Sequence, residues 1–203
     1  MEVVSKYVYE NSDGFIICLE NEKDVFTDNE GRPIILSIGM VFGTLEDMKI
    51  QVQYALENAK KYNIEKGICT IIETNHKSFR FPEYKIKKLL HFVKESYEDI
   101  LQGPIHFINL PFMYRIGFHM GVSLIPEKFR KNIQIHKNNK TLLENIPEKF
   151  QLKSWGGLQI FDINLWVKNK CKDENIINYT NHAKIEEVQL KDSLLALIRA
   201  NKH

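Results

Sequence analysis

Apolar runs alternate with amphipathic stretches along most of the chain. Four short apolar runs, bounded by glycine, proline or polar residues, are typical of buried strands. Between them, apolar residues recur every three or four positions, which predicts helices packed against a sheet. Strands are expected at residues 34–38, 66–72, 105–109 and 132–136, and helices at residues 45–62, 84–101 and 112–125. This alternation predicts an α/β fold with a mainly parallel sheet of about five strands and helices on both sides.

The stretch between Pro111 and Pro126 is unusual because apolar side chains occupy most of its circumference. Proline suits the first turn of a helix and disfavours a helical residue before it, so the two prolines bracket one helix. Its polar edge consists of Arg115, His119 and Ser123, which are spaced four residues apart. The helix is too short to span a bilayer, which takes about 20 apolar residues. It is expected either in the core or as a cover between an apolar cavity and a membrane.

The two ends of the chain add weaker patterns. Residues 15–19 form a further apolar run, residues 141–145 predict a helical turn, and residues 159–161 predict an edge strand. Apolar and charged positions alternate with helical spacing over residues 182–200, which predicts an amphipathic helix. We expect one domain over residues 1–203, with a lobe at residues 24–160 and a helical tail at residues 161–203 that packs on it.

Composition narrows the class of protein. A net charge of +2 gives no support for nucleic-acid binding. Three widely spaced cysteines indicate reduced, buried side chains of an intracellular protein rather than a disulfide framework. The first residues lack the charged start and apolar run of a signal peptide, and no apolar stretch reaches membrane-spanning length. We therefore expect a cytoplasmic protein.

Catalytic and metal-binding patterns are missing from the sequence. It contains no G-x-S-x-G elbow and no glycine-rich phosphate loop, and its seven histidines lack the spacing of a metal site. We expect no catalytic residue, no metal and no cofactor, and hence a protein that is not an enzyme.

Five short motifs follow one another in order. They read DNEGRPI at residues 28–34, INLP at 108–111, IPEKFRKNIQI at 125–135, LLENIP at 142–147 and WGG at 155–157. They resemble the D-x-x-G-R-P-V, I-N-x-P, L-P-E-K-T-R-K-K-I-x-I, L-L-x-x-I-P and (F/Y)-G-G motifs of CRAL-TRIO lipid-binding domains. That family includes cellular retinaldehyde-binding protein and tocopherol transfer protein. Five motifs in this order and at these distances make the resemblance specific.

The resemblance implies a non-enzymatic lipid-binding or lipid-transfer protein. One hydrophobic ligand, a phospholipid or similar, would lie between the sheet and a mobile gate helix at residues 112–125 and would exchange at membranes. The expected pocket residues are Leu36, Ile38, Ile68, Thr70, Ile72, Ile108, Phe112, Met113, Ile116, Met120 and Leu124. The residues expected at the membrane or the lipid headgroup are Arg115, His119, Lys128, Arg130 and Lys131. Thr70 matches the threonine of a Ser-x-Thr pair that contacts the headgroup in phosphatidylcholine-binding relatives, whereas Ile68 replaces the serine.

The sequence also departs from the family pattern. Residues 1–30 are too short for the N-terminal helical bundle that relatives commonly carry. The phosphatidylinositol-binding glutamate of relatives falls near residues 97–100, where its motif is lost, and their lysine aligns with Asn132 or Lys131. These departures favour a rival hypothesis, in which the domain is a scaffold that binds small GTPases or their regulators. The cations at residues 128–140 could dock on an anionic membrane or form a solvated loop.

Overall fold

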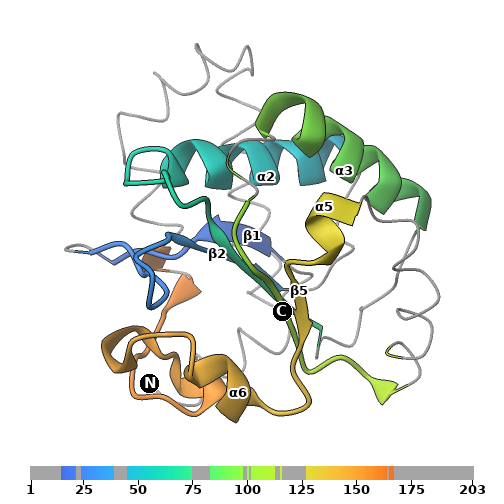
Figure 1. Cartoon of the computed structure of the whole chain (residues 1–203). Helices are drawn as coiled ribbons and strands as arrows, with labels where there is room; N and C mark the ends of the chain where they lie inside the picture. The colour runs from blue at the N-terminus through green and yellow to red at the C-terminus, as the bar shows by residue number, and fades with distance from the viewer. Residues whose placement is uncertain are drawn as a thin grey trace.

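The computed structural model describes residues 15–21, 24–38, 45–74, 83–97, 100, 102–112, 115, 127–163 and 165–166. Its strands are β1 (Phe15–Cys18), β2 (Ile34–Ile38), β3 (Cys69–Glu73), β4 (Ile105–Ile108) and β5 (Ile133–Ile135) (Figure 1). Its helices are α2 (Leu45–Ala59), α3 (Glu83–Tyr97), α5 (Glu127–Arg130) and α6 (Asn139–Leu143), followed by the 3₁₀ turns η2 (Glu148–Phe150) and η3 (Lys153–Trp155). Within these ranges, no helix is long and apolar enough to cross a membrane.

The five strands form one sheet in the order β1-β2-β3-β4-β5. Strands β2 to β5 pair in parallel, and β1 pairs antiparallel with β2 at the sheet edge. This arrangement confirms the predicted α/β fold with a mainly parallel sheet. The apolar run at residues 15–19 supplies the antiparallel edge strand β1, which the sequence pattern alone did not place.

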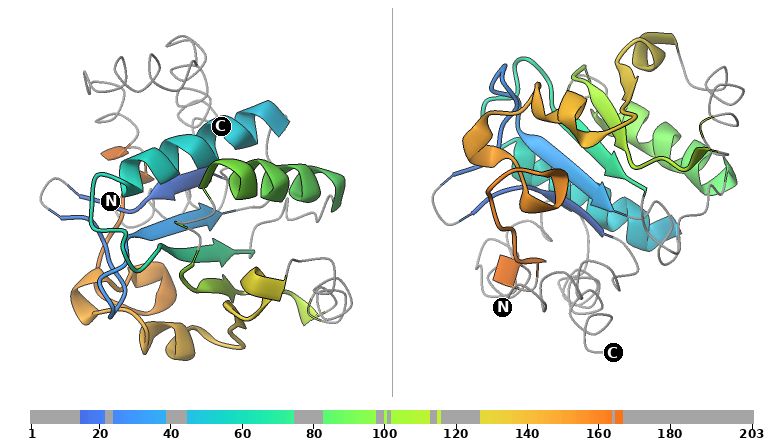
Figure 2. Two further views of the ribbon diagram at one scale, coloured as in Figure 1. Left: turned by 45° about the horizontal axis from the view of Figure 1, so that its top comes forward. Right: turned by 90° about the horizontal axis from the view of Figure 1, so that it is seen from below.

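Helices and turns cover the two faces of the sheet in different ways. Helices α2 and α3 lie side by side over one face (Figures 1 and 2). Connections between neighbouring parallel strands are right-handed, so β2–α2–β3 and β3–α3–β4 place both helices on the same side. The other face carries α6, η2 and η3. We call residues 139–163 and 165–166 the C-terminal cover.

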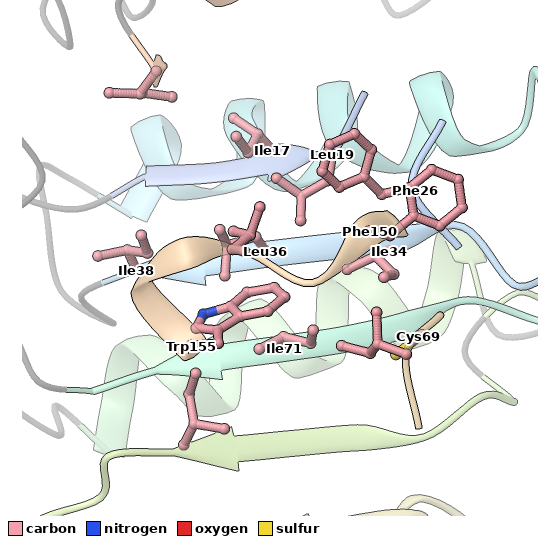
Figure 3. Packing of buried hydrophobic residues seen from close by; sticks show 14 of the residues in the cluster. Ile17, Leu19, Phe26, Ile34, Leu36, Ile38, Cys69, Ile71, Phe150 and Trp155 are labelled. Carbon is pink, nitrogen blue, oxygen red and sulfur yellow. The ribbon is translucent and has the colours of Figure 1, made fainter. Parts of the chain in front are cut away.

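The largest cluster of buried apolar side chains lies between the sheet and the C-terminal cover. Trp155 and Phe150 lie over β2 and β3 in this layer (Figure 3). The rings of Phe26 and Phe150 stack with centroids 5.1 Å apart. A second cluster joins the opposite face to α2 and α3, with Ala55, Leu56 and Val93 among its members. Both faces are therefore apolar, as continuous apolar strands require.

Several predicted boundaries were wrong by a few residues. Strand β3 begins at Cys69 rather than at residue 66, because a turn bonds the Gly67 N–H to the Ile64 carbonyl and Gly67 has a positive φ of 80°. Helix α2 ends at Ala59, after which the chain forms tighter turns. The edge strand expected at residues 159–161 is reduced to a single bridge between Leu152 and Gln159. The helices predicted at residues 112–125 and 182–200 lie outside the described residues, apart from Phe112 and Arg115.

Candidate functional site

Three of the predicted pocket residues lie on the sheet face that the C-terminal cover buries. They are Leu36, Ile38 and Ile108, and each is fully buried. All three belong to the same core cluster as Trp155 and Phe150. Their apolar surface is already occupied by protein side chains, so within the described part of the chain they serve the core.

The other three strand residues predicted for the pocket point to the opposite face. Successive strand residues point to opposite sides of a sheet, and the strand register places Thr70 beside Ile35 and Ile105 on this face. Ile72 shares the face with Thr70, and Ile68 packs in the cluster beneath α2 and α3. The six predicted strand residues are thus divided between the two faces. A single cavity wall can contain Thr70 and Ile72 but not Leu36, Ile38 or Ile108.

A separate group of apolar side chains occupies this face at the β5 edge of the sheet. We call it the β3–β5 apolar surface, and it consists of Ile72, Ile105, Phe107, Leu110, Ile133 and Ile135. Phe107 and Leu110 are buried, whereas the four isoleucines are only partly buried. Thr70 lies beside Ile105 in the register and is the polar position among the β3, β4 and β5 residues of this face. The surface can therefore hold an apolar molecule with one hydroxyl group beside it.

The described side chains of helices α2 and α3 do not join this surface. Many of their described apolar residues, Ala55, Leu56 and Val93 among them, pack in the cluster around Ile35 and Ile68, nearer to β1 and β2, whereas Tyr54 of α2 belongs to the cluster around Trp155. None of their described residues belongs to the group around Phe107. The β3–β5 apolar surface thus lies at the end of the helical layer, next to the connection between β4 and β5.

Two residues of the predicted gate helix are described. Phe112 exposes 69% of its side chain to solvent. The Arg115 N–H donates to the Pro111 carbonyl at 3.1 Å, and its Nε donates to the Leu110 carbonyl at 2.7 Å. The Arg115 side chain is therefore bonded to the backbone of Leu110, at the edge of the β3–β5 apolar surface. The other gate residues predicted to line the pocket or meet a headgroup, Met113, Ile116, His119, Met120 and Leu124, lie outside the described residues.

Exposed cations lie at the end of the connection between β4 and β5 and around the end of β5. Arg130 ends α5, Lys131 comes next, and both are exposed. Lys137 and Lys140 are also exposed around the end of β5. The position of the Lys128 side chain is outside the described part of the structure. The described cations are available to solvent, as a contact with an anionic surface would require.

Comparison with known proteins identifies the family. The family model of the CRAL/TRIO domain matches residues 26–157, well over half of the chain. The chain belongs to the CRAL/TRIO family. It is 24% identical to Clavesin-1 of Xenopus laevis over 191 residues, which cover 88% of this chain and 56% of that protein. It is 25% identical to Clavesin-2 of Homo sapiens over 171 residues, which cover 78% of this chain and 47% of that protein. The chain thus spans about half the length of these curated relatives.

The first CRAL/TRIO motif builds a turn rather than a binding site. Asp28 is buried, and its Oδ1 accepts hydrogen bonds from the backbone N–H groups of Glu30 and Arg32, both at 2.9 Å. Its Oδ2 accepts from Arg32 Nη1 at 2.9 Å. Gly31 takes a positive φ of 82° in this turn. The motif therefore fixes the entry into β2, and Pro33 favours an extended conformation of Arg32 as the chain leaves the turn.

A buried carboxylate joins two further CRAL/TRIO motifs. Glu73 ends β3 and is only 3% exposed. Its Oε1 accepts a hydrogen bond from Asn109 Nδ2 at 3.0 Å, and its Oε2 accepts one from Trp155 Nε1 at 3.3 Å. Asn109 belongs to the I-N-x-P motif and Trp155 to the W-G-G motif. Sequence analysis did not single out Glu73, although an acidic residue directly after the apolar pair Ile71 and Ile72 of a strand was the available signal.

A buried histidine pair was also missed. His106 Nδ1 and His136 Nε2 are 2.8 Å apart, and His136 Nδ1 lies 2.8 Å from the Thr141 hydroxyl. That hydroxyl donates to the Asn138 carbonyl at 3.2 Å, so it accepts from His136 Nδ1–H, and His136 Nε2 accepts from His106 Nδ1–H. His106 Nε2 then carries a lone pair, and no described residue donates to it. Both rings are neutral in this arrangement.

The described residues offer few groups for other chemistry. Among them, no set of three or more His, Cys, Asp or Glu side chains could hold a metal ion. Cys69 is buried, and burial raises the pKa of its thiol. A thiol of this kind stays protonated, and the thiolate is the reactive form. The apolar surface is therefore the feature of this structure best suited to bind a ligand.

Proposed function

We propose that this chain is a lipid-binding or lipid-transfer domain that holds one hydrophobic ligand, a phospholipid or a similar lipid, against the β3–β5 apolar surface. Family membership supports lipid binding in general. The observation that carries the specific proposal is the row of partly buried isoleucines, which no described side chain of α2 or α3 joins. Covering apolar area stabilises a complex by about 25 cal/mol per Å², so an acyl chain laid on this row would gain from leaving water. Thr70 is positioned to offer its hydroxyl to the polar part of the ligand.

The second part of the proposal concerns the connection between β4 and β5. We propose that residues 112–125 form a movable wall over the ligand, as the apolar composition and the two flanking prolines indicate. Opening of such a wall exposes apolar side chains, and bilayer lipid in place of water removes most of that cost. Exchange would therefore take place at a membrane surface.

Peripheral contact with anionic membranes is the third part of the proposal. Arg130 and Lys131 are exposed where this connection returns to the sheet. Each cation near an anionic bilayer contributes about 1 kcal/mol. We propose that these side chains orient the chain on the membrane. A cytoplasmic location with reversible membrane contact fits this role.

A lipid transfer assay with matched variants tests the proposal. The measurement is the movement of fluorescent phosphatidylcholine from donor to acceptor vesicles at known protein concentration. Ile105→Trp places a bulky ring on the proposed binding surface and is expected to slow transfer about fivefold or more. Ile160→Trp is the control, because Ile160 is 63% exposed and lies outside that surface. Equal transfer by the two variants, both folded, would contradict the proposed site.

The scaffold hypothesis remains the rival, and specific residues favour it. Ile68 occupies the position of the headgroup serine and is buried beneath α2 and α3. Asn132, one of the two residues that align with the headgroup lysine, donates to the Gln102 carbonyl at 2.8 Å. A chain that neither binds nor transfers lipid but retains a small GTPase or one of its regulators in a pull-down would support the scaffold.

A further inference from the structure

The ends of β3 and β4 are joined by a small buried polar group. Glu73 accepts from Asn109 with one carboxylate oxygen and from Trp155 with the other, at 3.0 Å and 3.3 Å. The neighbouring Thr74 adds two bonds to the Ile108 carbonyl, from its N–H at 3.2 Å and from its hydroxyl at 3.1 Å. A buried polar group that loses its hydrogen-bond partner costs about 1–3 kcal/mol, so these contacts favour one arrangement. The last residues of the two strands are therefore held in one fixed arrangement.

Asn109 is the residue at which the chain leaves β4 in an unusual conformation. Its φ is 57°, and no other described residue except glycine has a positive φ. Asparagine adopts the left-handed region more readily than most residues, and the bond to Glu73 holds its side chain there. The next residue, Leu110, is buried in the β3–β5 apolar surface. The turn at Asn109 therefore sets where Leu110 is placed.

Trp155 connects the same carboxylate to the core layer on the face opposite the β3–β5 apolar surface. It lies in the core layer beneath the C-terminal cover, over β2 and β3 (Figure 3). The turn that follows it is tightly packed, because a Cβ on Gly157 would lie 2.2 Å from the Gln151 carbonyl oxygen. The family motif has phenylalanine or tyrosine here, and phenylalanine has no N–H to donate. Tryptophan at this position thus creates a link to Glu73 that a phenylalanine could not form.

We propose that Glu73 is a positioning residue that couples the C-terminal cover to the turn at residues 109–111 through Trp155 and Asn109. The coupling determines how firmly Leu110 is held at the edge of the β3–β5 apolar surface. For a lipid bound on that surface, the consequence of the coupling is slower release. This consequence rests on the proposed function. The structural part of the coupling does not depend on the ligand.

Three variants of the full chain test the coupling. Trp155→Phe removes the N–H and keeps a ring, and Asn109→Gly removes the side-chain bond while tolerating the positive φ. Trp166→Phe is the matched control, because Trp166 lies in the same cluster and has an edge-to-face contact with Tyr54 that phenylalanine can retain. The first readout is hydrogen–deuterium exchange of Thr74 and of residues 106–112. The second is the release rate of fluorescent phosphatidylcholine into excess phosphatidylcholine vesicles.

We expect Trp155→Phe and Asn109→Gly to raise exchange at residues 106–112 about tenfold, the effect of leaving one buried polar group without its hydrogen bond. Trp166→Phe should change it less than about twofold. Equal exchange in Trp155→Phe and Trp166→Phe would overturn the coupling. Faster exchange in the two test variants, with no lipid held by the unmodified chain, would support the coupling and refute the proposed function. Faster exchange with an unchanged release rate would overturn the consequence for lipid.

Discussion

The buried histidine pair predicts that acid destabilises this fold. His106 is 1% exposed, and its pKa is lowered from 6.5 to about 4, mainly by burial and also by the neighbouring His136. The pKa of His136 is lowered as well, chiefly by burial. The charge of Asp28 opposes the lowering of the His106 pKa, whereas Arg32 adds to it. Glu144 opposes the lowering of the His136 pKa. The net result is that the folded chain keeps both rings neutral at pH values where the unfolded chain protonates them.

The sign and size of the effect follow from linkage. A group whose pKa is lower in the folded state stabilises the fold above the unfolded pKa, and this stability is lost as the pH falls. For His106 the loss begins near pH 6.5 and continues to about pH 4. With these two pKa values, it amounts to about 2 kcal/mol at pH 5 and about 3 kcal/mol at pH 4. That is a large part of the ~5–15 kcal/mol that stabilises an ordinary domain.

Urea unfolding at two pH values measures this effect. The free energy of unfolding is determined near pH 7.5 and near pH 5 for the unmodified chain and for His106→Asn, in which an amide N–H can replace Nδ1–H. The variant should lose about 2 kcal/mol less than the unmodified chain between the two conditions. His91→Asn is the control, because His91 is exposed on α3. Equal losses in the unmodified chain and His106→Asn would refute the reasoning.

Two further predictions concern turns that the fold requires. Asp28→Ala removes three hydrogen bonds and is expected to lower the free energy of unfolding by about 2–3 kcal/mol in urea titrations; the exposed Glu30→Ala serves as its control, and a loss no larger than that of the control would contradict the structural role of Asp28. Gly103→Ala would place a Cβ 1.8 Å from the Ile68 carbonyl oxygen, so it should lower the melting temperature by more than about 10 °C. Gly31→Ala meets no atom within 4 Å and should cost only the strain of its positive φ, about 1 kcal/mol; equal melting temperatures for the two alanine variants would contradict this difference.

The sequence was sufficient to predict the strand and helix order, because long apolar runs and amphipathic repeats depend only on neighbouring residues. It did not reveal which side of each strand faces which layer. Both sides of β2, β3 and β4 carry isoleucine or leucine, so Leu36 and Ile108 could not be distinguished from Ile72 as pocket residues. Only the strand register and the covering elements separate the two faces.

The polar contacts could not be predicted from the sequence for a different reason. Glu73 and Trp155 are 82 residues apart in the chain, and His106 and His136 are 30 residues apart. No short pattern predicts that such residues meet. The D-x-x-G-R-P motif differed in this respect, since its bonds join residues two and four positions apart. Its location was recognised from the sequence, whereas its role as a turn was recognised only from the hydrogen bonds in the structure.

The central claim is that this chain holds one lipid, and native mass spectrometry of the purified protein tests it most directly. We predict a species heavier than the chain by the mass of one lipid, with organic extraction recovering that lipid at about one mole per mole of protein. The contradictory result is a folded chain at its own mass that gains no mass after incubation with vesicles of mixed phospholipids.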